Sequence, residues 1–430
     1  MSLQFITGNS GNGKTKYLFN RIVKEAKANP RDNYLVIVPE QFTMQTQRQL
    51  VDLSENKAIM NIDVLSFKRL AYRVFDELGI TNLTVLEETG KNLVLRKLAA
   101  QEADKLGVIG RNLNRIGYIS EVKSLLSELV QYNISPEELG RYIASGRLSD
   151  TLSDKLKDVL VLYEAFEKFM KDKYITAEEI LNVLSNVAEE SAILRNSVIA
   201  FDEFTGFTPI QNQLIKKLFV ISKKIYVTLT IDCREDIFKS RGMQELFDMP
   251  KRTVKSLTEM AAFYGIEVEE PIILDKNYRL AENEELSFME QQLFRKRRGS
   301  FKKAPKHIHI DCLRDPKQEL TKIARRINEL VRNENLRYRD IAIVTGDVNI
   351  YAGYVREIFD KYNIPYFIDA TQEILFHPFI EFIRSIPDIA AQNFSADAVF
   401  RFLRCGFSEL LDSEIDVLEN YVLACGVRGK

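Results

Sequence analysis

The sequence has few of the residues from which metal cages and disulfide frameworks are built. It contains four cysteines and three histidines in 430 residues. The cysteines, Cys233, Cys312, Cys405 and Cys425, stand singly and form no Cys-x-x-Cys pair. They indicate neither a disulfide framework nor a metal site, and we expect reduced, mostly buried thiols.

The sequence also lacks long hydrophobic runs and an excess of either charge. No apolar run reaches the roughly 18 residues of a membrane span, and the first residues do not form a secretory signal. A net charge of −1 argues against a protein that coats nucleic acid through its overall potential. With 45% hydrophobic and 28% charged residues, we expect a cytoplasmic globular protein of about two or three domains that does not contact a membrane.

A phosphate-binding loop lies close to the N-terminus. Residues 8–15 read Gly-Asn-Ser-Gly-Asn-Gly-Lys-Thr and fit the pattern of a glycine, four residues, and Gly-Lys-Ser/Thr. The apolar segment 3–7 before it and the amphipathic segment 15–28 after it predict the strand and helix that this motif needs. Lys14 would reach the β- and γ-phosphates of ATP, and the Thr15 hydroxyl would reach Mg²⁺. The expected ATP-binding residues are Gly8, Asn9, Ser10, Gly11, Asn12, Gly13, Lys14 and Thr15.

A second acidic motif follows another apolar segment. Residues 198–203 read Val-Ile-Ala-Phe-Asp-Glu, so that two carboxylates follow a predicted buried strand. We predict that Asp202 holds the metal, directly or through water, and that Glu203 polarises the attacking water. A helix N-cap also explains an acidic pair after a strand. The phosphate-binding loop upstream favours the metal site.

One local run of positive charge stands out. Seven basic residues lie within residues 295–306. A solvated linker between domains and a loop that contacts phosphates both explain such a run. In the second case, Arg297 and Arg298 are the expected DNA-binding residues.

The order of the predicted elements divides the chain into three parts. Strand and helix patterns alternate in residues 1–85 and again in 191–280, which predicts one α/β domain with a parallel sheet. Residues 86–190 show helical periodicity only and predict an all-helical insertion. Residues 281–430 predict a second, incomplete α/β domain with a helical C-terminal end. The strands predicted in that last part are 308–310, 341–344 and 366–368.

Residues 202–211 resemble the Asp-Glu-Phe-Gln-Asp-Thr-Asn-x-x-Gln motif of superfamily 1 helicases. Asp202, Glu203, Phe204 and Gln211 match this motif in register. The resemblance implies that both α/β parts are RecA-like domains, of which the first carries the P-loop and the second is truncated.

Two further segments resemble motifs of the same helicases. Residues 65–70 are similar to the motif that closes a strand and touches the DNA backbone, which implies DNA contacts from Ser66 and Phe67. Residues 274–279, Leu-Asp-Lys-Asn-Tyr-Arg, are similar to their Leu-x-x-Asn-Tyr-Arg motif. That motif implies that Arg279 meets the γ-phosphate from the far side of a cleft, a role that suits a guanidinium.

Other segments narrow the resemblance to the AddB family, whose members form one half of the AddAB helicase-nucleases. These segments are residues 38–43, 204–209, 338–343, 364–369 and 415–421. The resemblance implies an ATP-dependent helicase and exonuclease subunit that processes double-stranded DNA ends for repair by homologous recombination. It also implies an AddA-type partner in a heterodimer, and DNA as a ligand. The nuclease carboxylates and the iron–sulfur cluster of the family are expected only in a C-terminal part that this sequence does not contain.

The sequence departs from the helicase pattern at two places. Thr205 stands where those helicases have a glutamine, and residues 230–236 stand in place of their Gly-Asp-x-x-Gln motif. We therefore expect a protein that binds ATP and DNA but couples them poorly. A fully active DNA translocase is the alternative. A P-loop kinase is a weaker one, because it leaves the Asn-Tyr-Arg motif unexplained.

Overall fold

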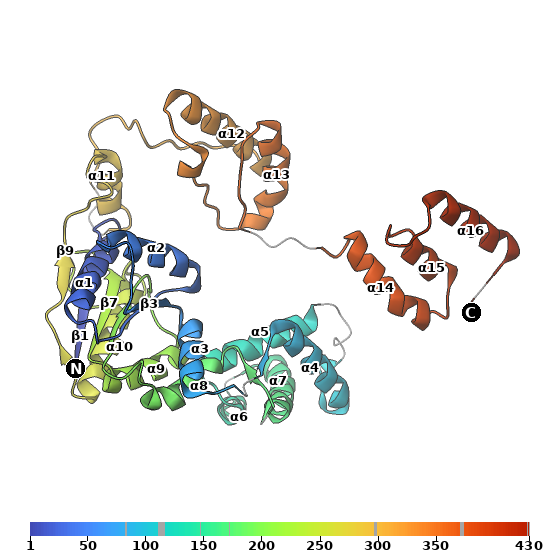
Figure 1. Cartoon of the computed structure of the whole chain (residues 1–430), viewed down its shortest axis with the longest axis horizontal. Coiled ribbons are helices and arrows are strands. Elements are labelled where there is room, and N and C mark those ends of the chain that lie inside the picture. The colour runs from blue at the N-terminus through green and yellow to red at the C-terminus, as the bar shows by residue number, and fades with distance from the viewer. Residues whose placement is uncertain are drawn as a thin grey trace. The chain divides into compact units, whose positions relative to one another are not determined.

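A computed structural model describes residues 1–81, 84–110, 117–146, 148–171, 173–295, 299–369, 374–427 and 429. The chain divides into two compact units, Met1–Ile308 and His309–Lys430. Figure 1 shows the elements of both in chain order by colour.

A seven-stranded sheet forms the centre of the first unit. Its strand order is β3-β2-β6-β7-β1-β8, and β9 also pairs with β1. The strands are β1 (Ser2–Gly8), β2 (Tyr34–Ile37), β3 (Ile62–Leu65), β6 (Val198–Phe201), β7 (Lys224–Thr230), β8 (Glu267–Val268) and β9 (Ile272–Leu274). Every one of these pairings is parallel. The predicted α/β fold with a parallel sheet is confirmed, and the architecture is consistent with a RecA-like domain.

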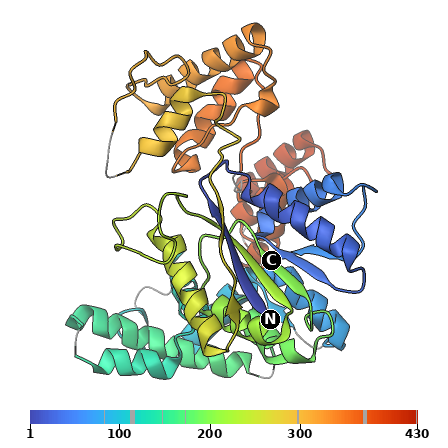
Figure 2. The ribbon, with the colours of Figure 1, turned by 90° about the vertical axis from the view of Figure 1, so that its left-hand side faces the viewer.

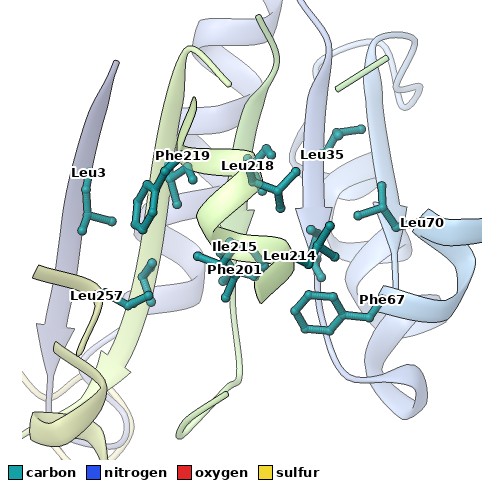
Figure 3. Packing of buried hydrophobic residues seen from close by; sticks show 14 of the residues in the cluster. Leu3, Leu35, Phe67, Leu70, Phe201, Leu214, Ile215, Leu218, Phe219 and Leu257 are labelled. Carbon is teal, nitrogen blue, oxygen red and sulfur yellow. The ribbon is translucent and has the colours of Figure 1, made fainter. Parts of the chain in front are cut away.

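Successive residues of each strand pack into two different cores, because strand side chains alternate between the faces of a sheet. Tyr34 and Val36 face a core with α1 and α2, whereas Leu35 and Ile37 face a core with α3, α8, α9 and α10. Figure 2 shows the sheet with helices on both faces, and Figure 3 shows the packing around Phe201. The covering helices are α1 (Lys14–Ala28), α2 (Thr43–Leu53), α3 (Phe67–Leu78), α8 (Ile180–Val187), α9 (Pro209–Ile221) and α10 (Asp248–Phe263).

Between α3 and α8 the chain forms a group of helices with a core of its own. These are α4 (Glu88–Gln101), α5 (Tyr118–Gln131), α6 (Pro136–Ala144) and α7 (Asp150–Met170), flanked by the paired strands β4 (Val85–Leu86) and β5 (Ile175–Thr176). The buried Lys91 ties this group together by an ion pair of 2.7 Å with Glu178. The first unit ends with α11 (Glu284–Gln292) and the segment that follows it.

The second unit is helical in the residues that the structure describes. Its helices are α12 (Pro316–Asn333), α13 (Val348–Lys361), α14 (Pro378–Ala391), α15 (Ala396–Leu403) and α16 (Asp412–Cys425). Short 3₁₀ helices span Glu40–Phe42, Ala103–Lys105 and Ala188–Glu190 in the first unit, and Tyr338–Asp340 in the second. No helix in the described ranges is long and apolar enough to cross a membrane.

The strands predicted at 308–310, 341–344 and 366–368 were wrong, since no described residue there is in a strand. An apolar segment becomes a strand only when a neighbouring strand takes up its backbone hydrogen bonds. Ile310 and Val344 are 94% and 93% exposed and have no such neighbour among the described residues. The prediction of mostly buried cysteines was also wrong. Cys312 and Cys425 are exposed, because each lies in a part of the second unit that buries few residues.

Candidate nucleotide and magnesium site

The phosphate-binding loop joins the end of β1 to the start of α1, as the sequence predicts. Gly11 and Gly13 have φ angles of +88° and +80°, which side chains rarely adopt. A Cβ at Gly11 would also lie 2.8 Å from the Cβ of Arg279. Glycine is therefore required here both for the backbone conformation and for space. The loop leaves the N-terminus of α1 facing the cavity, where its partial positive charge favours an anion.

Lys14 folds back onto this loop. Its Nζ atom donates hydrogen bonds of 3.0 Å to the carbonyl oxygens of Gly8 and Asn9. Burial lowers the pKa of Lys14, and the nearby carboxylates of Glu203 and Asp202 oppose this shift. The ammonium group is thus partly desolvated, which disfavours its charged form. A bound phosphate would place a negative charge beside it and stabilise that form.

Two carboxylates at the end of β6 face Lys14 and Thr15 across the loop. Thr15 donates a hydrogen bond of 3.2 Å from its hydroxyl to Oε1 of Glu203. Asp202 is 1% exposed, and its Oδ1 accepts a hydrogen bond from the Thr228 hydroxyl. Burial raises the pKa of Asp202, although the Thr228 hydrogen bond opposes this.

The donor atoms around Asp202 fit a magnesium ion. Its Oδ2 is buried and has no hydrogen-bond partner among the described residues, a costly arrangement for a carboxylate unless a cation satisfies it. The Thr15 hydroxyl supplies a second hard oxygen. No cluster of three or more His, Cys, Asp or Glu side chains in the described ranges could hold a metal. Mg²⁺ is held by one or two protein oxygens together with phosphates and water, and Asp202 and Thr15 offer such oxygens.

The Asn-Tyr-Arg segment lies directly on the phosphate-binding loop. The backbone N–H groups of Tyr278 and Arg279 donate to the Gly11 carbonyl oxygen at 3.0 and 3.4 Å. Asn277 donates from its side chain to the Ser10 carbonyl oxygen at 2.8 Å. The segment thus belongs to the same unit as the loop, and Arg279 lines the cavity from there.

Residues of the loop, of the start of α1, of the end of β6 and of the Asn-Tyr-Arg segment line one cavity of about 700 Å³. Its lining includes Lys14, Thr15, Asp202, Glu203, Tyr278 and Arg279. This volume suits a nucleotide-sized ligand. The arrangement brings the amides of the loop, a lysine and two carboxylates together at one place.

Several contacts at the loop could not be read from the sequence. Asn9 accepts a hydrogen bond of 2.9 Å from the Cys233 backbone N–H and donates one of 2.8 Å to Glu290 on α11. Asn12 donates to the Leu274 carbonyl oxygen at 2.6 Å. These contacts fix the loop against β9, α11 and the segment after β7, which lie more than 200 residues further along the chain. No local sequence signal marks such pairs.

The predicted DNA-binding residues lie in three different situations. Ser66 caps α3, accepting a hydrogen bond of 3.3 Å from the Arg69 N–H. Phe67 is 7% exposed and stacks on Phe201, with ring centroids 5.8 Å apart. Its ring therefore packs in the core, out of reach of DNA in this conformation. Arg297 and Arg298 lie outside the described residues.

The first residue of the basic run 295–306 forms an ion pair in the interior of the first unit. Arg295 is 12% exposed at its side chain and donates from Nε to the buried Asp232 at 2.9 Å. Arg234 donates to the same carboxylate at 2.6 Å. Burial by itself would raise the pKa of Asp232, but its hydrogen bonds with Arg234 and the two guanidinium charges lower it to about 2. Arg295 thus anchors the run close to the end of β7.

Comparison with known proteins decides the family. Residues 5–290 match the family model described as ADDB, N-terminal. The chain belongs to the AddB family. It is 39% identical to an AddB relative from Lachnoclostridium phytofermentans that is named as a subunit of an ATP-dependent helicase/deoxyribonuclease, covering all of this chain and 38% of that protein. The proteins of the same name from Clostridium tetani and Clostridioides difficile are each 34% identical, again over this whole chain and 38% and 37% of their own length. The chain therefore spans little more than a third of the length of the curated relatives that it matches.

Proposed function

We propose that this chain is the ATP-binding, DNA-contacting N-terminal part of an AddB-type helicase-nuclease subunit that processes double-strand breaks for recombinational repair. The observation that carries the proposal is the cavity in which Lys14, Thr15, Asp202, Glu203 and Arg279 converge. The relatives' name, which describes an ATP-dependent helicase/deoxyribonuclease, supports the same activity for the whole protein. The cofactors are ATP and Mg²⁺.

The charged and polar groups named above each have a proposed part in binding the triphosphate. The loop amides and Lys14 hold the β- and γ-phosphates, and Arg279 offers a planar pair of donors to the γ-phosphate. Thr15 and Asp202 would hold Mg²⁺, and the bound ion would supply positive charge against the phosphate oxygens. Glu203 orients and deprotonates the attacking water.

The coupling of this site to DNA movement is proposed to be degenerate. Thr205, in the position of the helicases' glutamine, accepts a hydrogen bond of 3.1 Å from Thr253 on α10 through its backbone carbonyl oxygen. Asp232, in the segment that replaces a second helicase motif, is held by Arg234 and Arg295. These interactions tie both segments to neighbours within the unit, which opposes their movement in response to the γ-phosphate.

An AddA-type helicase-nuclease subunit and DNA are the proposed partners, and the cytoplasm, where bacterial DNA lies, is the proposed location. The iron–sulfur cluster and the nuclease centre belong to the remaining part of the family's full-length proteins. A fully active translocase is the alternative function, favoured by the retention of Glu203 at the cavity.

The two functions differ in DNA-stimulated ATP turnover. The test uses the full-length AddB protein with its partner, and Lys14→Ala in the same protein as the control. The difference in ATP turnover between the unmodified protein and Lys14→Ala gives the turnover at this site. Degenerate coupling predicts that DNA changes this difference only slightly. A strong stimulation that disappears in Lys14→Ala would establish the translocase instead.

A further inference from the structure

Asn9, the second residue of the phosphate-binding loop, is held from two sides by its side chain. The residue is buried, with 5% of its surface exposed. Its Oδ1 accepts a hydrogen bond of 2.9 Å from the Cys233 backbone N–H, and its Nδ2 donates one of 2.8 Å to Oε1 of Glu290 on α11. The second bond ends on a carboxylate, and such a bond is stronger than one between neutral groups. The loop is therefore anchored to α11.

The backbone of Asn9 contacts the lysine of the loop. Its carbonyl oxygen accepts hydrogen bonds of 3.0 Å from Nζ of Lys14 and 3.2 Å from the Asn12 N–H. A bound triphosphate would draw the Lys14 ammonium away from this oxygen, because a phosphate is the stronger acceptor. The side-chain contacts of Asn9 would then still hold the loop. A loop that is already ordered in this way lowers the entropic cost of binding.

Glu290 is itself fixed by the charged groups around it. Nη2 of Arg295 lies 3.7 Å from the same Oε1, and Nε of Arg295 lies 2.9 Å from the carboxylate of Asp232. Asp232 directly precedes Cys233 in the chain. The contacts thus close a ring that consists of Asn9, Glu290, Arg295, Asp232 and Cys233. Because this ring restrains the carboxylate of Glu290, little further ordering is needed for its hydrogen bond with Asn9.

The helix α11 buries little of its own surface. Glu285 is the single buried residue among its nine, all of which the structure describes. The Glu285 carboxylate accepts hydrogen bonds of 2.6 and 2.8 Å from the backbone N–H groups of Lys306 and His307, at the end of the first unit. A helix with so few buried contacts depends on its polar contacts for local stability. The bond to the loop is one of these contacts, so the state of the loop should affect how readily α11 opens.

We propose that Asn9 and Glu290 form a positioning pair, which holds the phosphate-binding loop ready for the triphosphate and links nucleotide binding to the local stability of α11. Glu290 acts through Asn9 and does not itself contact the nucleotide. Such coupling is reciprocal: if α11 helps the loop to bind ATP, bound ATP must stabilise α11 against local opening. The proposal rests on the proposed function, in which the loop binds ATP with Mg²⁺.

Calorimetric titration of the chain with ATP and Mg²⁺ tests the hydrogen bond. Glu290→Ala removes the acceptor for Asn9, and we expect it to weaken ATP binding roughly tenfold. Glu290→Gln keeps an oxygen that can accept this bond and removes only the charge, so the affinity should not fall. The matched control is Glu284→Ala on the same helix, where the side chain is 71% exposed and pairs with Lys303. This control should leave the affinity unchanged.

A second substitution tests whether the two residues act together. Asn9→Ala should weaken ATP binding at least as much as Glu290→Ala, because it also removes the acceptor for the Cys233 N–H. Adding Glu290→Ala to Asn9→Ala should lower the affinity no further, since the bond between the two is already lost. Independent, additive losses would overturn the pair. Circular dichroism establishes that each variant is folded.

Hydrogen–deuterium exchange of residues 284–292 tests the link to α11 and needs no variant for its first step. In the unmodified chain, saturating ATP with Mg²⁺ should slow exchange of these amides at least about fivefold. The slowing should persist in Glu290→Gln and disappear in Glu290→Ala, both at saturating ATP. A purely structural role of Glu290 would not make the exchange depend on ATP.

Three results would overturn the inference and leave the proposed function standing, provided that ATP binding still depends on Lys14. The first is an equal loss of affinity in Glu290→Ala and Glu290→Gln, which would assign the effect to charge. The second is an affinity of Glu290→Ala equal to that of Glu284→Ala. The third is ATP binding without slower exchange in α11. If the unmodified chain binds no ATP, the proposed nucleotide site fails and the positioning pair fails with it.

Discussion

The hydroxyl of Thr15 lies 3.2 Å from Oε1 of Glu203 and donates a hydrogen bond to it. This bond joins the first turn of α1 to the end of β6, 188 residues further along the chain. Glu203 has a φ angle of +63°, so its backbone is held in a conformation that a glutamate rarely adopts. The strain lies where the carboxylate must face the phosphate-binding loop.

Glu203→Gln should separate ATP binding from hydrolysis. The amide keeps the size of the side chain but cannot take a proton, so we expect hydrolysis by the full-length protein to fall by about 10² or more. ATP affinity should stay close to that of the unmodified protein. Single-turnover hydrolysis and calorimetry measure the two effects, with the exposed Glu189→Gln as control. Equal hydrolysis by Glu203→Gln and the unmodified protein would contradict the role of Glu203 as the base.

Asp202→Asn should change stability in a way that depends on pH and on Mg²⁺. Burial raises the folded-state pKa of Asp202. Its stabilising contribution is therefore present below the unfolded pKa and is lost as the pH rises through the folded pKa. Without metal, we expect the variant to be more stable than the unmodified chain at neutral pH, and the difference to vanish in acid.

Urea unfolding in EDTA and in Mg²⁺, at acidic and neutral pH, checks this expectation. Mg²⁺ with ATP should stabilise the unmodified chain at neutral pH and the Asn variant far less. Equal stabilisation of both proteins would show that Asp202 does not hold the metal. Thr228→Val is a useful companion, because it removes the hydroxyl that donates to Asp202 and keeps the carboxylate.

Asp232→Ala should destabilise the first unit by roughly 3 kcal/mol, because it leaves the largely buried Arg295 guanidinium with only its longer ion pair of 3.7 Å to Glu290. The pKa of Asp232 is lowered to about 2. Its contribution is therefore present above the unfolded pKa and is lost as the pH falls through about 2. Denaturant unfolding over this acidic range measures both effects. Asp236→Ala, at an exposed ion pair with Lys239, should change stability by less than about 0.5 kcal/mol. Equal effects of the two substitutions would contradict the anchoring role of Asp232.

Phe67 should act through packing. Phe67→Ala opens the aromatic core beside Phe201 and should cost roughly 3–5 kcal/mol. Phe67→Leu should cost less than about 1.5 kcal/mol and leave DNA affinity unchanged. Thermal unfolding and anisotropy with labelled DNA measure the two. Weaker DNA binding in Phe67→Leu at unchanged stability would restore the DNA contact that the motif resemblance implies.

The parts of the fold that could be predicted are those that depend on neighbours in sequence. The loop 8–15 carries its own strand and helix, so β1 and α1 followed from local periodicity. Asp202 and Glu203 follow a buried strand, and parallel strands bring their carboxyl ends to one edge of the sheet. The sequence therefore predicts that Asp202 and Glu203 lie close to Lys14 and Thr15.

The rest depends on contacts that no local pattern encodes. Phe67 begins an amphipathic helix, and only the packed structure shows that its ring faces the core. Arg295 belongs to a basic run that suggests solvent or phosphate, yet it pairs with Asp232, 63 residues earlier. The apolar segment 341–344 has the composition of a strand, but a strand also needs a partner to which its backbone can bond.

The central claim is that this chain binds ATP with Mg²⁺ at the loop that contains Lys14. The most direct measurement is calorimetric titration of the chain with ATP and Mg²⁺, for the unmodified protein and for Lys14→Ala. We predict saturable binding by the unmodified chain and a loss of affinity on the order of a hundredfold in the variant, since a charge-assisted contact to the phosphates is removed. Binding of equal strength in the two proteins, or in neither, would contradict the claim.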